Sequence, residues 1–71
     1  GVAAGVLIGT GTVDASAKLE VRTTTGKTML LPRMTSAQRD AIGAPAEGLL
    51  IYNTDDQQLE FFCSSSWYSL N

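Results

Sequence analysis

The sequence predicts an α+β protein that is mainly β, built from short antiparallel strands and hairpins with one short helix. Short apolar or alternating runs are separated by clusters of glycine, proline, threonine and serine. A helical period occurs in one stretch only, and that stretch is about two turns long. The chain has 71 residues and a single cysteine. It therefore forms one small domain at most, without an internal disulfide.

The predicted helix covers about residues 36–42. Thr35 is the expected N-cap, and Gln38 completes a T-x-x-Q capping box. Gly43 is placed to take the left-handed position after the last turn, and Pro45 prevents the helix from resuming.

Strands are expected on both sides of this helix. The run Thr28–Leu31 is compatible with a strand and should stop at Pro32. Leu49–Tyr52 is a continuous apolar run too short for a helix. It should form a hairpin with Gln58–Cys63, which alternates loosely, and Trp67–Leu70 should add a final short strand.

The beginning of the chain is predicted to be organised differently. Residues 1–17 are expected to form an extended arm, and residues 18–71 the β-rich module. Val6-Leu7-Ile8 fits either a short strand or a segment lying along a partner chain. Ala17–Val21 alternates apolar and charged residues, which indicates an edge strand, and the stretch Leu19–Leu31 could pair as a hairpin.

Composition argues against several classes of function. Five basic and seven acidic residues give a net charge of −2 with no basic patch, so nucleic-acid binding is not expected. No apolar stretch approaches the roughly 20 residues of a membrane span. There is no histidine to activate Cys63, so we expect a buried structural thiol and no enzymatic activity. No cofactor motif is present, and Asp55-Asp56 is better explained as a solvated turn than as a metal site.

A chain this short needs stabilisation beyond its own core, which rarely supplies more than ~3–5 kcal/mol at this size. Hydrophobic residues make up 44% of the sequence, too many for a disordered chain. Aromatic and aliphatic residues crowd both faces of the C-terminal hairpin, and the helix can cover only one of them. Sharing a core between several copies is the solution that remains, so the sequence predicts a homo-oligomer.

The stretch GKTMLLPRMTSAQRDAIGAPAEGLLIYNTDDQQLEFF, followed by SSSWYSL, resembles a module of phage tail-fibre and related virion appendage proteins. The same module occurs in surface proteins of Bacteroidetes-type bacteria. The upstream IGTGTVDASAKLEV extends the resemblance to about residues 6–70. The resemblance implies an intertwined homotrimer at the virion surface or, in the bacterial case, at the cell surface. Cys63-Ser64-Ser65 replaces the Asp-Gly or Asn-Gly turn of the family pattern, so a longer or differently shaped turn is expected there.

We therefore predict a structural or attachment module of a viral fibre, spike or similar appendage, whose trimer presents loops to a host receptor or glycan or to other virion proteins. One alternative is a carbohydrate-binding or carbohydrate-processing unit. Another is a bacterial secreted surface protein that carries the same module. The candidate interface or structural residues are Arg33, Tyr52, Phe61, Phe62, Trp67 and Tyr68.

Arg33 has two interpretations. Its stem could lie along the core with the guanidinium in water. Alternatively, it could pair with Asp40 or Glu47, within the chain or across a subunit boundary.

Overall fold

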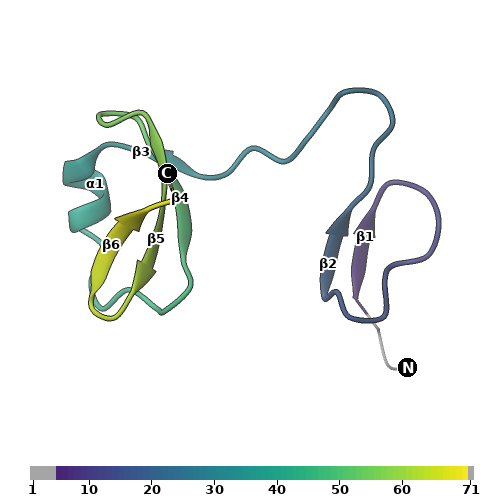
Figure 1. The fold of residues 1–71 in the computed structure, drawn as a ribbon, viewed down its shortest axis with the longest axis horizontal. Coiled ribbons are helices and arrows are strands. Elements are labelled where there is room, and N and C mark those ends of the chain that lie inside the picture. Colours follow the sequence, from purple (N-terminus) through teal and green to yellow (C-terminus); the bar gives the residue numbers. More distant parts are fainter. Residues whose placement is uncertain (1–4, 71) are drawn as a thin grey trace. The chain divides into compact units, whose positions relative to one another are not determined.

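The computed structural model describes residues 5–70 and divides them into two compact units, one up to Leu30 and one from Leu31 onward (Figure 1). The first unit contains β1 (Val6–Ile8) and β2 (Leu19–Val21). The second contains β3 (Arg33–Met34), α1 (Ser36–Asp40), β4 (Leu50–Asn53), β5 (Gln58–Cys63) and β6 (Ser66–Ser69). The α+β, mainly β class predicted from the sequence is confirmed.

The division differs from the predicted boundary between residues 17 and 18. Val6 and Ile8 pair with Leu19 and Val21, so the N-terminal segment belongs to the same unit as β2. Residues 1–4 of the expected arm lie outside the described residues.

The first unit is a two-stranded parallel ribbon. Val6 N donates to Lys18 O at 2.6 Å, and Arg22 N donates to Ile8 O at 2.8 Å. The expected hairpin within Leu19–Leu31 does not form, because β2 takes β1 as its partner. A Cβ on Gly9 would collide with the carbonyl of Arg22, so this close approach of the two chain segments requires glycine.

The helix begins as the sequence predicts and ends earlier. Gln38 N donates to Thr35 Oγ1 at 3.2 Å and Thr35 N donates to Gln38 Oε1 at 2.9 Å, which confirms the capping box. The last helical residue is Asp40 and not residue 42. Ala41 N already shares its hydrogen between Ala37 O and Gln38 O, so the final turn tightens and the helix stops. The left-handed conformation falls on Ala44, with φ 50°, and not on Gly43 as predicted.

The second unit is a four-stranded sheet in the order β3-β4-β5-β6. β4, β5 and β6 form two consecutive antiparallel hairpins, as predicted. β3 joins β4 in parallel through two residues, a pairing that the sequence did not indicate. The expected strand Thr28–Leu31 is wrong, because pairing with β4 starts only at Pro32, whose carbonyl accepts from Tyr52 N at 2.9 Å.

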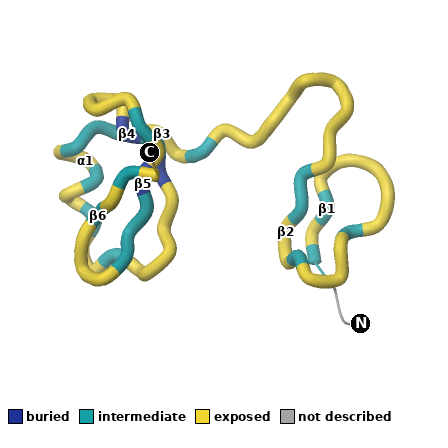
Figure 2. Tube along the Cα trace, in the orientation of Figure 1, coloured by how far each residue is buried: buried dark blue, intermediate teal, exposed yellow. Residues whose placement is uncertain are grey.

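Burial is confined to the middle of this sheet, on β4 and β5 (Figure 2). Among the described residues, Ile51 is the one buried hydrophobic side chain, at 3% exposure. The other two buried residues are polar: Asn53, fully buried, and Glu60, 3% exposed. A single chain therefore has a core that is small and largely polar.

Candidate oligomer interface

The sheet of the second unit has two chemically different faces. Successive side chains of a strand point to opposite faces, and residues in register across strands share a face. On this basis the first face, called here the helix face, carries Met34, Ile51, Asn53, Gln58, Glu60, Phe62, Trp67 and Ser69. The opposite face, called the open face, carries Leu50, Tyr52, Leu59, Phe61, Cys63, Tyr68 and Arg33. Leu70 extends the open face, because its N–H continues the ladder to Leu59 O at 3.0 Å.

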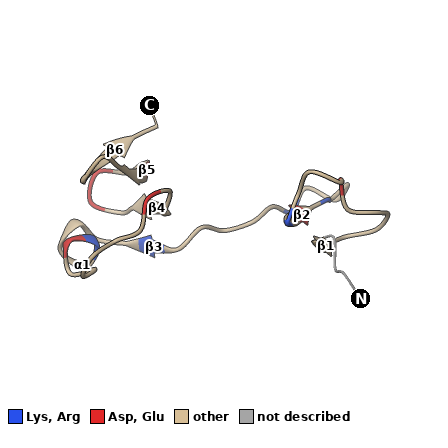
Figure 3. Cartoon of the chain, turned by 90° about the horizontal axis from the view of Figure 1, so that it is seen from below, with Lys and Arg blue, Asp and Glu red and all other residues tan. Residues whose placement is uncertain are grey.

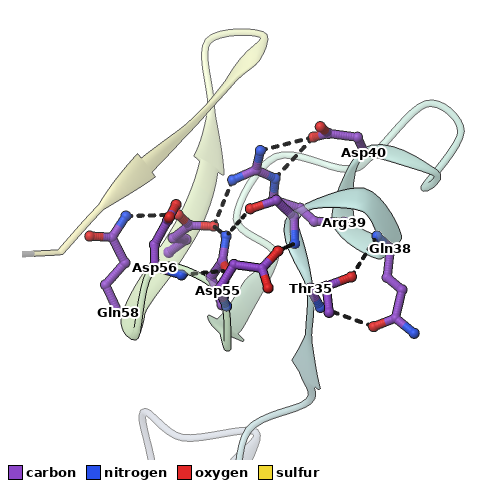
Figure 4. Close-up of polar contacts among 10 residues, drawn as sticks. Thr35, Gln38, Arg39, Asp40, Asp55, Asp56 and Gln58 are labelled. Carbon is purple, nitrogen blue, oxygen red and sulfur yellow. Dashed lines mark hydrogen bonds and ion pairs between the residues drawn. The ribbon is translucent and has the colours of Figure 1, made fainter.

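Polar contacts join the helix to the turn after β4 (Figure 4), and Asn53 connects the helix face to both. Its Nδ2 donates to Ser36 Oγ at 3.0 Å and to Glu60 Oε1 at 3.1 Å. Its Oδ1 accepts from the backbone N–H groups of Asp55 and Asp56 at 2.9 and 3.1 Å. The buried amide thus uses all of its hydrogen-bonding capacity to hold three segments together.

Glu60 is the charged centre of this face. Burial alone would raise the pKa of its carboxyl group. Hydrogen bonds from Gln58 Nε2 at 2.8 Å, from Arg39 Nη1 at 2.9 Å and from Asn53, together with the charge of Arg39, outweigh burial and hold the pKa below its ordinary value. Among the described residues no buried side-chain nitrogen or oxygen lacks a partner.

Arg39 connects the helix to the sheet through contacts with Glu60 and Trp67. Its hydrogen bond to Glu60 and its contacts with Asp40 at 3.0 Å raise the pKa of the guanidinium. The guanidinium carbon also lies 6.0 Å from the centre of the Trp67 ring, which in turn packs edge-on against Phe62 at 5.3 Å. Phe62 and Trp67, two of the candidate residues from the sequence, therefore contact their own chain on the helix face.

Among the described elements of the second unit, none covers the open face. The helix makes its contacts on the other side, through Asn53, Glu60 and Trp67. Leu50, Tyr68 and Leu70 remain 44%, 47% and 53% exposed. Besides Arg33, three aromatic candidate residues lie here: Tyr52 and Phe61, which are half-buried, and Tyr68, whose ring centre is 5.9 Å from that of Phe61.

Of the leucines on the open face, Leu59 and Leu70 were among the apolar residues that the sequence predicts to crowd the C-terminal hairpin, but Leu50 was not. Leu50, Leu59 and Leu70 lie beside the aromatic residues, and each is exposed. The alternation of Leu59 with Phe61 and Cys63 was the available signal, but strand register was needed to add Leu50, which pairs with Phe61.

Arg33 borders the open face on the edge strand β3, in register with Tyr52, and its side chain is exposed. Figure 3 marks basic residues in blue, and this colour appears on β3. Among the described residues no ion pair includes Arg33. Of its two predicted partners, Asp40 pairs with Arg39, and Glu47 accepts from Ser64 N at 3.0 Å. Neither is joined to Arg33 within one chain.

The first unit also has an apolar face. Val6, Ile8 and Leu19 are each more than half exposed and share one side of the ribbon by register and alternation. A two-stranded ribbon is at best marginally stable in water on its own. Its apolar side therefore also lacks a cover.

For other kinds of site, the part of the chain that the structure describes offers little. Over residues 5–70 no three histidine, cysteine, aspartate or glutamate side chains come together as a metal site. The single helix found there is also far too short to cross a membrane.

The fold and its exposed apolar faces define a small β-rich module with surface that partner chains can cover. The chain belongs to the family described as phage tail like trimerisation region, whose family model matches residues 7–71. It is thus a structural module of a phage tail or tail-like particle that forms homo-oligomers. Comparison with curated proteins and with solved structures finds no match.

Proposed function

We propose that three copies of this chain assemble by burying their open faces against one another, and that the apolar ribbons of their first units add a second contact. The observation that carries this proposal is the apolar face of β4, β5 and β6, which no described element of the second unit covers. The helix face is already occupied by α1, so the open face is the side of this sheet left for a partner.

Burial of the open face would contribute enough free energy to stabilise an oligomer. Monomers rarely expose contiguous apolar patches larger than a few hundred Å², and the largest patch on a protein surface is often a functional one. Burying roughly 300 Å² of such surface per chain would contribute on the order of 7 kcal/mol before entropic costs. With Ile51 as the buried hydrophobic residue of the described chain, this contribution exceeds what the internal core can supply.

The proposed role in the particle is mechanical and not enzymatic. A trimer of this kind would hold three chains in register at the virion surface and hold the turns at both ends of the sheet toward a host receptor or toward other virion proteins. The turn after β4 (residues 54–57) and the turn after β5 (residues 64–65) are the exposed segments in those positions. Binding of intact particles to host cells, compared with particles that carry altered turns, would test this finer role.

Carbohydrate binding is the competing role, since Tyr52, Phe61 and Tyr68 form an aromatic group on the open face. The two roles make opposite demands on Tyr68, because a sugar platform must stay accessible in the assembled protein while a trimer contact is buried. A Tyr68→Ala variant should weaken assembly if the surface is a contact. Loss of glycan-array binding with unchanged oligomeric mass would favour the carbohydrate role.

The sharpest test of the trimer contact places a charge at the centre of the open face. Leu59→Lys should abolish the trimer or leave unfolded chain, because a lysine would be buried among apolar side chains. Ala37→Lys is the matched control, since Ala37 is exposed on the helix and lysine is a good helix former. Sedimentation velocity measures the oligomeric state of both variants. A Leu59→Lys protein that remains a trimer would show that the open face is not the contact.

A further inference from the structure

Among the described residues of the second unit, one basic and one acidic side chain have neither an ion pair nor a hydrogen bond. Between Leu31 and Leu70 the basic residues are Arg33 and Arg39, and the acidic residues are Asp40, Glu47, Asp55, Asp56 and Glu60. Arg39 is held by Asp40 and Glu60. Glu47 accepts from Ser64 N at 3.0 Å, and Asp55 Oδ2 accepts from Ser36 N at 3.0 Å. Within these residues, the side chains of Arg33 and Asp56 are the charged groups without an ion pair or hydrogen bond.

Both groups lie at the same end of the sheet. β3 runs parallel to β4, with Arg33 beside Tyr52 and Met34 beside Asn53. Asp56 belongs to the turn 54–57 that follows Asn53 directly, and Figure 1 shows this turn and β3 at one end of the sheet. Glu47 contacts the turn after β5, at the opposite end.

We infer that Arg33 of one copy forms an ion pair with Asp56 of the neighbouring copy in the trimer. The inference rests on the proposed function, because it needs the open face to be an interface. A threefold rotation keeps each group at its height along the axis. When three sheets turn their open faces toward an axis along the strands, an Arg33 on the edge strand β3 faces the next sheet near the end that carries Asp56.

Arg33 needs a partner of opposite charge once a neighbouring copy covers the open face. Arg33 borders that face, so a neighbouring copy displaces part of the water around its guanidinium. A charged group that loses water must gain a hydrogen-bonding partner of opposite charge. Asp56 is the carboxylate of the second unit that is free to supply one, and a guanidinium can hold a carboxylate through two parallel hydrogen bonds. The pair would set the orientation of each sheet relative to its neighbour, because apolar contacts alone are not directional.

Charge reversal tests the inference on the whole chain. Arg33→Glu and Asp56→Lys should each lower the trimer association constant. An exposed pair contributes about five-fold per interface at the upper end, and the symmetry repeats it three times, so a fall on the order of 100-fold is expected. The double variant should return close to wild type. Lys27→Glu, with the same change in charge at an exposed position of the first unit, is the control and should trimerise as wild type does.

Mixing the two single variants distinguishes a pair between chains from a pair within one. In an equimolar mixture, a chain with the Arg33→Glu change can meet a chain with the Asp56→Lys change, so mixed trimers should form at concentrations where each variant alone does not. Recovery in the double variant without recovery in the mixture would place the pair inside one chain and overturn the inference. The loss should also shrink at an ionic strength of about 1 M.

The two proposals fail in different ways. A wild-type trimer whose single charge variants assemble as well as wild type would overturn the Arg33–Asp56 pair and leave the open-face contact standing. A monomeric wild type would overturn both.

Discussion

Asn53 Nδ2 lies 3.1 Å from Glu60 Oε1, and this hydrogen bond joins the two most buried polar residues of the described chain across the β4–β5 hairpin. The helix reaches the same pair from the other side, through Ser36 and Arg39. A polar cluster thus does on the helix face what an apolar core does in larger domains. The apolar side chains are left for the open face, where a partner can use them.

Asn53 should be the least replaceable residue of this cluster. Asn53→Ala leaves two turn N–H groups without their acceptor and removes one of the three donors to the buried Glu60 carboxylate, and a loss of about 2–4 kcal/mol in the free energy of unfolding is expected. Gln58→Ala removes one hydrogen bond to the same carboxylate and should cost about 1 kcal/mol. Urea denaturation at one fixed protein concentration measures both, since an oligomer's apparent stability depends on concentration. Equal losses in the two variants would argue against the central place of Asn53.

Glu60 should make stability fall in acid. Its pKa is lower in the folded protein than the ordinary value of 4.5. A carboxyl group of this kind contributes stability that is present above the unfolded-state pKa and is lost as the pH falls through the folded-state pKa. Denaturation midpoints should therefore hold steady above about pH 5 and decline below about pH 4.5. Glu60→Gln should flatten that decline while lowering stability at pH 7, and a decline of the same size in this variant would assign the acid sensitivity to other groups.

Cys63 should report assembly. The expected burial of this thiol is only half met in a single chain, where Cys63 is of intermediate exposure on the open face. Labelling by a thiol reagent should be slow in the trimer and become fast when Leu59→Lys disrupts it. Cys63→Ser should assemble normally with a modest loss of stability, because the thiol already contacts Ser64 Oγ at 3.5 Å. Equally fast labelling in wild type and in Leu59→Lys would mean that Cys63 is not covered by a partner.

Local signals in the sequence predicted the second unit well. The Thr35 and Gln38 box located the start of the helix, and the alternation in Gln58–Cys63 gave β5 with its observed bounds. The helix end was missed because the final turn tightens at Ala41 and the helix stops at Asp40, before the Gly43 on which the prediction relied.

The two parallel pairings could not be predicted in the same way. β1 pairs with β2, and β3 pairs with β4, although a long segment separates the two strands in each case. No local residue pattern marks such a pairing in the sequence. The helix-face cluster was hidden for a similar reason. Glu60 and Asn53 resemble ordinary polar residues of a strand until register places them opposite the helix.

The mass of the wild-type protein tests the central claim most directly. Light scattering or sedimentation equilibrium at two concentrations, one near 1 μM and one about 100-fold higher, should give three times the 7.5 kDa of the single chain at both. Circular dichroism on the same samples should show a folded, mainly β protein. A well-folded species of 7.5 kDa at either concentration would show that one chain is stable with its open face in water, and would contradict the account.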